Sequence, residues 1–118
     1  MNIVIQKGNL TRDPELKYTP GGSPVAEFAV AVSETWTDNA GNKREDVCFL
    51  DCFAWGKTAE IIAKYFTKGK PILISGKLKQ DNWEDKATGQ KRSKLRVQVD
   101  RFEFCDRAAR DKIGRAHV

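Results

Sequence analysis

Five stretches of this 118-residue chain alternate apolar residues with polar or small ones, and only one stretch places apolar residues at helical spacing. A period of two is typical of strands with one buried face, whereas apolar residues three and four positions apart are typical of an amphipathic helix. We therefore predict five strands and a single short helix. The expected strands are residues 2–10, 24–36, 45–55, 72–79 and 93–99.

Turn-forming residues separate these stretches. Residues 38–42, with the sequence DNAGN, tolerate positive φ and predict a hairpin between the second and third strands. The expected helix covers residues 59–66 and ends before Gly69. A long polar segment, residues 80–92, joins the last two strands. The apolar phase of the final strand slips near Asp100, which predicts either a β-bulge or the end of the strand there. We find no internal repeat.

The order of the predicted elements narrows the fold class. So few residues, with a single helix between the third and fourth strands, suit a small closed barrel better than an open sheet. We predict an all-β fold, the five-stranded Greek-key barrel known as the oligonucleotide-binding fold or OB-fold. A chain of this length holds one domain, which we assign to residues 1–105, followed by a short tail at residues 106–118.

The few cysteine and histidine residues argue against several kinds of site. Three cysteines, an odd number, do not suit a disulfide framework, and Cys48 and Cys52 lie on one strand face with no CxxC pair. We predict that both are small buried core residues and not zinc ligands. The only histidine, His117, leaves a histidine-based mechanism little to work with. These counts favour neither a metal site nor a histidine-based enzyme.

Two features of the sequence bear on location. The chain has no apolar run long enough to span a bilayer, and its first residues, MNIVIQKGNL, lack the features of a secretory signal. We therefore expect a cytoplasmic protein with no membrane partner.

Positive charge gathers in the second half of the chain. The formal net charge is +5, and residues 57–101 hold twelve Lys or Arg against five Asp or Glu. An acidic polymer would be held there, although charge alone fits a solvated lysine-rich surface equally well. The candidate phosphate contacts are Lys7, Arg12, Lys57, Lys77, Lys79, Lys91, Arg92, Lys94 and Arg96.

Aromatic side chains occupy positions where a barrel core does not need them. Phe49, Phe53 and Trp55 share the face of the third strand opposite its core residues, and Trp83 lies within the polar segment after the fourth strand. A ring can stack on a base of any identity, while nearby lysines neutralise the phosphates between bases. The candidate base-stacking residues are Trp36, Phe49, Trp55 and Trp83, and of these we favour stacking for Trp55 and Trp83.

Packing is the alternative role for some of these rings. Trp36, Phe49 and Phe53 could pack across the hairpin or against a partner subunit, and for Phe53 we favour packing. Trp36 lies on the core side of its strand, so its exposure depends on the hairpin extending beyond the barrel.

Three stretches of the sequence resemble the bacterial and phage single-stranded DNA-binding proteins, and the resemblance covers about residues 1–104. They are GNLTRDPELKYTPGGSPVAEFAVAVSETW, WGKTAEIIAKYFTKGKPILISGKLK and NWEDKATGQKR. The resemblance implies sequence-independent binding and protection of single-stranded DNA in replication, recombination and repair, with no catalysis and no cofactor. It implies base stacking on the four aromatics named above and a nucleoid-associated location. It also implies a homo-oligomer, usually a tetramer, whose dimer contact covers the first strand with Ile3 and Val4.

The end of the chain departs from the pattern of that family. Bacterial members usually continue into a flexible linker and an acidic tip that recruits replication and repair enzymes, whereas this chain ends in DRAARDKIGRAHV. We therefore do not expect tail-mediated partners. The last six residues can be encoded by ATC GGA AGA GCA CAC GTC, which matches an adapter used in short-read sequencing. We hypothesise that residues 113–118 are not native and that the natural protein continues beyond Lys112.

Two other functions fit the same residues. An OB-fold RNA-binding protein would also use rings and lysines, and nothing in the sequence reads the 2′-hydroxyl, so only the family resemblance favours DNA. A protein-interaction module would instead use the aromatic face as an interface.

Overall fold

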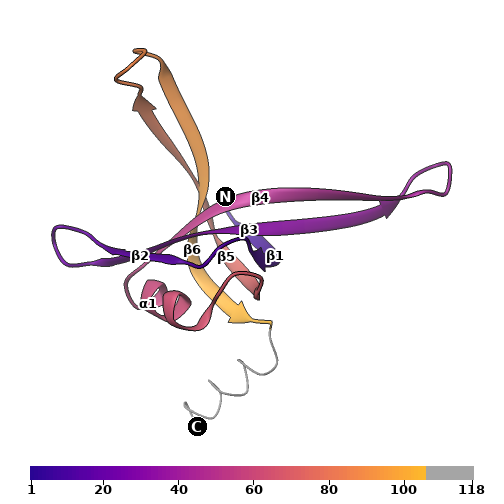
Figure 1. Ribbon diagram of the computed structural model, residues 1–118, viewed down its shortest axis with the longest axis horizontal. Helices are drawn as coiled ribbons and strands as arrows, with labels where there is room; N and C mark the ends of the chain where they lie inside the picture. The colour runs from indigo at the N-terminus through magenta and orange to yellow at the C-terminus, as the bar shows by residue number, and fades with distance from the viewer. Residues whose placement is uncertain (106–118) are drawn as a thin grey trace, which may run out of the picture.

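The computed structural model describes residues 1–105 as six strands and one helix (Figure 1). The tail at residues 106–118, with the six residues that we hypothesise to be non-native, lies outside the described residues. The elements are β1 (Val4–Leu10), β2 (Glu15–Tyr18), β3 (Pro24–Thr37), β4 (Lys43–Trp55), α1 (Gly56–Tyr65), β5 (Pro71–Glu84) and β6 (Lys91–Phe104).

Five of the strands close into a barrel. The sheet order is β1-β5-β6-β4-β3-β2, and a further antiparallel pairing between β1 and β3 joins the two ends of the five-stranded part. β4 and β6 pair in parallel, at Cys52 with Val97, while the other pairings are antiparallel. This arrangement confirms the predicted all-β OB-fold, with α1 between the strands that we expected to be the third and fourth.

β2 is a sixth strand that we did not predict. It has four residues, all of them exposed, and it pairs only with β3. Its sequence, ELKY, alternates polar and apolar residues, but four residues are the shortest run in which a period of two can be recognised, and all four side chains are exposed.

The core lies inside the barrel and beneath α1. Phe28 and Val30 of β3 and Ile62 of α1 are fully buried, and Phe66 follows the helix and stacks on Phe104 with ring centroids 4.8 Å apart. The apolar residues of α1 recur at helical spacing because one face of the helix packs against the barrel, mainly against β3.

Two hairpins extend beyond the barrel as two-stranded arms (Figure 1). Along β3, burial changes from complete at Phe28 to exposed from Ser33 onward, and Cys48, opposite Val32, is exposed. The prediction that Cys48 is a core residue is therefore wrong, because β4 has no core beneath it at that point. The prediction holds for Cys52, which is 2% exposed.

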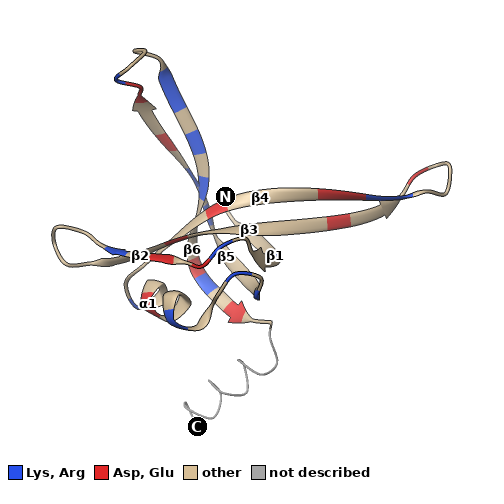
Figure 2. Cartoon of the chain, viewed as in Figure 1, with Lys and Arg blue, Asp and Glu red and all other residues tan. Residues whose placement is uncertain are grey.

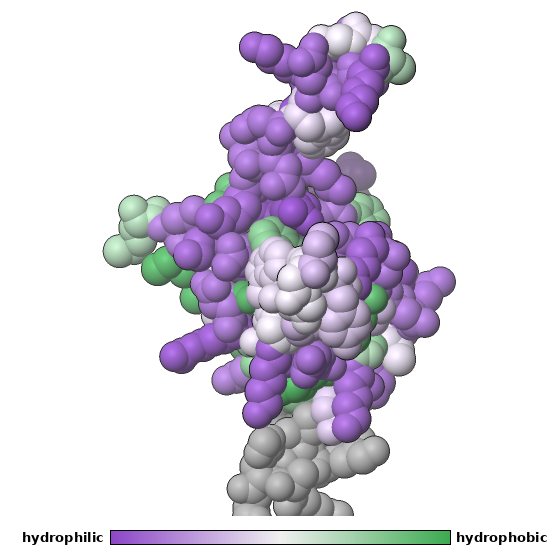
Figure 3. All heavy atoms as spheres, turned by 90° about the vertical axis from the view of Figure 1, so that its left-hand side faces the viewer, coloured by the Kyte–Doolittle hydropathy of each residue, from purple (hydrophilic) through white to green (hydrophobic). Residues whose placement is uncertain are grey.

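The second arm is built from the polar segment that we expected to join two shorter strands. β5 and β6 continue as a paired ladder from Leu78 with Val97 out to Glu84 with Lys91. In Figure 3 this arm is covered mainly by hydrophilic side chains. A free-standing ladder buries neither face, so its strands need not alternate apolar and polar residues.

A β-bulge lies where this arm joins the barrel. Ser75 pairs with Arg101 and Gly76 pairs with Val99, so Asp100 is the extra residue. Of the two alternatives predicted from the phase slip, the bulge is present, and the strand continues to Phe104. Gly76 is buried, and a Cβ atom at this position would collide with the backbone oxygen of Gln98. The bulge therefore requires glycine, and the added twist at a bulge changes the direction in which the strands leave the barrel.

Candidate nucleic-acid interface

Side chains of β4, β5 and β6 that point away from the core form one surface, which we call the outer face. Phe53 pairs with Gln98, which in turn pairs with Lys77, so these three side chains define a row across the strands. Alternate residues along each strand extend the row into a surface. The outer face consists of Phe49, Asp51, Phe53 and Trp55 of β4, Arg92, Lys94, Arg96 and Gln98 of β6, and Lys77, Lys79, Asp81 and Trp83 of β5.

Three of the four predicted stacking residues lie on the outer face. Phe49 is 69% exposed, and Trp55 and Trp83 are each 46% exposed. Phe49 and Trp55 come from β4, whereas Trp83 lies near the tip of the arm formed by β5 and β6. Strand phase places these large apolar rings outward, where no element within residues 1–105 covers them.

Trp36 lies on the opposite face of its arm. It pairs with Arg44 across the hairpin and shares the phase of the core residues of β3, but it is 46% exposed because the arm has left the barrel. Its indole Nε1 donates a hydrogen bond of 3.0 Å to Asp46 Oδ2. This bond restrains the indole, so that the ring of Trp36 lies across the strand in one orientation.

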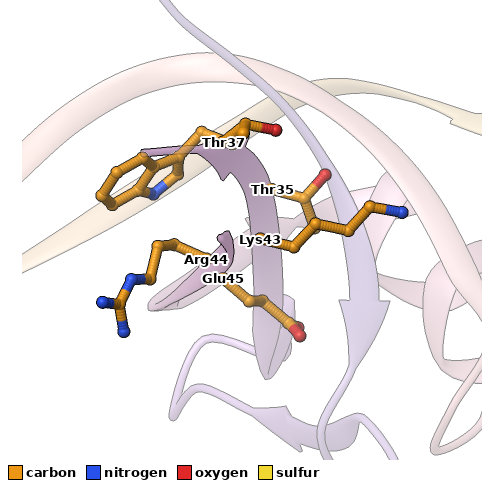
Figure 4. Close-up of a pocket in the computed structure, with 6 residues that line it drawn as sticks. Thr35, Thr37, Lys43, Arg44 and Glu45 are labelled. Atoms are coloured by element: carbon orange, nitrogen blue, oxygen red, sulfur yellow. The ribbon is translucent and has the colours of Figure 1, made fainter. Parts of the chain in front are cut away.

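Trp36 lines a pocket on the arm formed by β3 and β4 (Figure 4). Lys43 and Arg44 extend from the strand in different directions, as neighbouring residues in a strand do. The pocket is lined by Thr35, Trp36, Thr37, Lys43, Arg44 and Glu45.

Phe53 is covered by a residue of its own barrel. The guanidinium carbon of Arg96 lies 4.2 Å from the centroid of the Phe53 ring, and Phe53 is 7% exposed. The expectation that Phe53 packs is thus met by β6, rather than by the hairpin or a partner subunit.

Ion pairs hold several basic residues of the outer face. Lys94 Nζ lies 3.2 Å from Asp51 Oδ2, Arg92 Nε lies 3.3 Å from Asp85 Oδ2, and Arg96 pairs with Asp81. Figure 2 shows the basic residues spaced along the arm of β5 and β6.

Lys77 and Lys79 are different, because within residues 1–105 they form no ion pair. Their positive charges are therefore uncompensated by any described carboxylate. Of the outer-face cations, these two are the ones most available to an incoming anion.

The remaining predicted phosphate contacts lie off the outer face. Lys57 opens α1 two positions after Trp55, and Lys91 lies on the opposite side of the arm, paired with Glu84. Lys7 lies on β1, on the far side of β5 from β6, and pairs with Leu73. Arg12 lies in the loop after β1. The fold therefore brings Lys57 close to the outer face but leaves Lys7 and Arg12 away from it.

The two arm tips share a short sequence motif that the sequence analysis missed. The first tip reads WTDNAGNKR and the second WEDKATGQKR, so each has Trp-x-Asp, then Ala, Gly, and Lys-Arg. In both arms the tryptophan pairs with the arginine across the strands, as Trp36 with Arg44 and Trp83 with Arg92. One inserted residue separates the two copies, which hides the repeat from a fixed-period comparison.

In both tips the aspartate of the motif accepts a backbone hydrogen bond within the turn, although the second turn is one residue longer. Asp38 Oδ1 accepts hydrogen bonds from the backbone N–H groups of Ala40 and Asn42, and Asp38 Oδ2 accepts one from Arg44. Asp85 likewise accepts a bond from the N–H of Ala87. The bond from Asn42, supported by those from Arg44 and Ala40, holds the pKa of Asp38 below its ordinary value.

The described residues provide little for catalysis or metal binding. They contain no group of three or more His, Cys, Asp or Glu placed to hold a metal ion, and no helix among them is long and apolar enough to cross a membrane. Burial, with a smaller contribution from the charge of Asp51, raises the pKa of the Cys52 thiol to about 12. This thiol is held neutral and is a poor nucleophile.

Comparison with known proteins decides the family. The model of the single-strand binding protein family matches residues 1–105. This chain belongs to that family. A single-stranded DNA-binding protein of Wolinella succinogenes is 43% identical over 105 residues, which are 89% of this chain and 64% of the relative. One from Helicobacter pylori is 42% identical, over 90% of this chain and 59% of the relative. The chain therefore spans about three-fifths of the length of these family members.

Solved structures of the family share the fold. The structure described as a Plasmodium falciparum SSB complex with ssDNA has a TM-score of 0.83 at 22% identity, covering 90% of this chain and 96% of that one. A deletion mutant of the single-stranded DNA binding protein from Thermus aquaticus has a TM-score of 0.79 at 29% identity, covering 91% of this chain and 51% of that one. The resemblance that the sequence predicted is thus confirmed at the level of family and fold.

Proposed function

We propose that this chain binds single-stranded DNA without sequence preference, using the outer face. The observation that carries the proposal is the placement of Phe49, Trp55 and Trp83 on one surface with Lys77 and Lys79. Exposed rings offer stacking to bases of any identity, and cations on the same surface can meet the phosphates between them. Family relatives named single-stranded DNA-binding proteins support this choice of ligand.

Each group in the site has a separate role in the proposal. Base stacking on an aromatic residue contributes about 1 to 3 kcal/mol, so the three rings of the outer face, with Trp36 on the other arm, give affinity without reading sequence. Phosphate contacts come from Lys57, Lys77, Lys79, Lys91, Arg92 and Lys94, and they make binding depend on salt. Lys7 and Arg12 contact DNA only where a long strand continues around the barrel.

We also propose a homotetramer. Ile3 and Ile5 are 63% and 64% exposed at the start of the chain, whereas Val4 packs against the core. Ile5 and Lys7 lie on the open side of β1, next to Leu73 of β5. Exposed isoleucines on a strand are typical of surfaces that another subunit covers, so the residues to test are Ile3 and Ile5 rather than Val4.

In the cell, the proposed role is protection of single-stranded DNA during replication, recombination and repair, by a non-catalytic protein in the cytoplasm near the nucleoid. Family membership supports this role. It is also the reason for preferring DNA over RNA and over a protein-interaction module, because exposed rings and lysines suit all three ligands.

A competition experiment tests the choice of ligand. The protein is bound to labelled poly(dT), and unlabelled poly(dT), poly(U) and duplex DNA are added in turn at the same nucleotide concentration. We expect unlabelled poly(dT) to compete much better than the other two, because paired bases cannot stack on the rings. Displacement by poly(U) at equal or lower concentration would favour an RNA-binding protein, and failure to bind any of the three would favour a protein-interaction module.

A further inference from the structure

Arg96 occupies the centre of the outer face in an arrangement that none of the other basic residues there has. Its guanidinium lies over the ring of Phe53 at 4.2 Å, and its side chain is 25% exposed. A guanidinium is planar, and planar cations stack on aromatic faces. One surface of the group therefore contacts Phe53, and the part that remains exposed is available to a ligand.

Carboxylates already compensate the charge of this guanidinium. Arg96 Nε pairs with Asp81 Oδ2, and Arg96 Nη1 lies 4.0 Å from Glu27 Oε1. Asp81 compensates the charge of the guanidinium, and Glu27, which also pairs with Lys17 at 3.6 Å, adds negative charge nearby, so both acids would repel an incoming phosphate. Arg96 is therefore a poorer phosphate contact than Lys77 or Lys79, which have no such partner among the described residues.

The same ion pairs favour a different contact. They hold the guanidinium in place over the ring, so that little side-chain entropy is lost when a flat group packs against it. Unpaired bases stack on arginine guanidinium planes as well as on aromatic rings. The geometry of a fixed, charge-compensated guanidinium is suited to a base and not to a phosphate.

We propose that Arg96, mounted on Phe53, is a base-stacking platform between Phe49 and Trp55. The proposal rests on the proposed binding of single-stranded DNA and assigns a role within it. Phe49 and Phe53 lie four positions apart along β4, a separation of about 13 Å for a strand that rises about 3.3 Å per residue. Because Phe53 is covered, no stacking surface would lie between Phe49 and Trp55 without Arg96. With it, the row runs from Phe49 through Arg96 to Trp55.

Two substitutions at this position separate stacking from charge. Arg96→Lys keeps the positive charge and removes the planar group, and Arg96→Gln removes the charge. A stacking role predicts that Arg96→Lys lowers the association constant for oligo(dT) about fivefold or more while the slope of log K against log salt is unchanged. A phosphate contact predicts nearly normal binding by Arg96→Lys and a slope flattened by about 0.7 in Arg96→Gln.

Two control variants give reference values for the salt slope and for the affinity. Lys77→Gln removes an uncompensated cation from the same face and is the reference for a flattened slope. Arg101→Lys makes the same substitution at an exposed arginine beyond the bulge of β6, and it should leave affinity unchanged. Thermal unfolding of each variant shows whether a loss of affinity reflects a loss of folded protein.

A measurement on the unsubstituted protein covers the case in which an Arg96 variant does not fold. The Nε–H signal of Arg96, identified by its absence from the Arg96→Lys spectrum or by connectivity, is followed by NMR as oligo(dT) is added. A base stacked on the guanidinium shifts this signal upfield through its ring current, whereas a phosphate, which can reach only the Nη–H groups because Nε is buried, causes no upfield shift. Absence of an upfield shift when oligo(dT) is bound, or normal binding by Arg96→Lys, would overturn the inference and leave the proposed function intact. Failure of the unsubstituted protein to bind oligo(dT) would overturn both.

Discussion

At the scale of single residues, the outer face separates two kinds of contact. Trp55 and Trp83 offer apolar rings that exchange no counterions when a base stacks on them, whereas Lys77 and Lys79 carry charges that displace counterions from phosphates. The two contributions to binding can therefore be measured independently, because only the second depends on salt.

Replacing one ring tests the stacking contribution. Trp55→Ala or Trp83→Ala should lower affinity for poly(dT) by about 1 to 3 kcal/mol and leave the salt slope nearly unchanged. Lys77→Gln should do the opposite and flatten the slope of log K against log salt by about 0.7. Fluorescence anisotropy of a labelled oligonucleotide at several salt concentrations measures both quantities. Normal affinity in both tryptophan variants would show that the rings do not stack on bases.

The two cysteines of β4 give a test that needs no DNA. Cys48 is exposed, while Cys52 is 2% exposed with its pKa raised from 9.0 to about 12. A thiol-specific reagent at pH 8 should therefore modify Cys48 in the native protein and leave Cys52 unmodified until the protein unfolds. Mass spectrometry of the peptides identifies the sites, and Cys48→Ser is the control. Equal rates at both positions would contradict the described burial.

The raised pKa of Cys52 also gives a direction for stability against pH. Because the folded state favours the neutral thiol, the contribution of this group to stability is fully present below pH 9.0. It is lost as the pH rises from there toward about 12, where the folded thiol itself ionises.

Individual residues of the site were predictable where strand phase alone sets their direction. Phe49 and Trp55 are exposed as a period of two predicts, and Cys52 is buried for the same reason. The cover over Phe53 was not predictable, since Arg96 comes from β6 and reaches β4 only through their parallel pairing. Contacts between strands distant in sequence leave no periodic signal in either strand.

At the scale of elements, the arms depend on where each hairpin leaves the barrel. The sequence predicted the hairpin at residues 38–42 and an irregularity near Asp100, but not the length of the arms. Residues 80–92 appeared to be a loop because they are polar. Cys48 appeared to be a core residue because it lies on the same face of the strand as the buried Cys52. In both cases the missing information was whether a core lies beneath the strand, which only the packed structure supplies.

The bulge at Gly76 gives the element-scale prediction. Gly76→Ala should destabilise the protein by about 1 to 3 kcal/mol, because the added Cβ forces the backbone of Gln98 to move within a packed barrel. Urea unfolding at fixed protein concentration measures the change. Gly21→Ala is the control, since the atom nearest to its added Cβ is Thr19 Oγ1 at 4.0 Å. Equal stability of the two variants would contradict the close approach of β5 and β6 at the bulge.

At the scale of the whole molecule, one barrel extends two arms in different directions (Figure 1), and residues 4–8 of β1 pair with β5 alone. The arms enlarge the surface available to a DNA strand well beyond that of the barrel itself. The exposed isoleucines lie beside Ser75 and Lys77 of β5, at the edge of the outer face and two strands away from the rings of β4, so a second copy could cover them and leave those rings open to DNA.

Light scattering tests this arrangement. The unsubstituted protein should have the mass of a tetramer, and Ile5→Glu should reduce that mass by at least half, because a buried unpaired carboxylate disfavours the contact. Leu16→Glu, which places the same charge on β2, should leave the mass unchanged. A monomer of the unsubstituted protein at micromolar concentration would contradict the proposed assembly and leave a single barrel as the binding unit.

The most direct test of the central claim is the fluorescence of single tryptophans during titration with poly(dT). Three variants each keep one of Trp36, Trp55 and Trp83 and carry phenylalanine at the other two positions. Stacking of a base on an indole quenches its emission, so we predict strong quenching of Trp55 and Trp83, which share the outer face with the uncompensated lysines. Binding of poly(dT), shown by anisotropy, with no quenching of either residue would contradict the assignment of the outer face as the DNA interface.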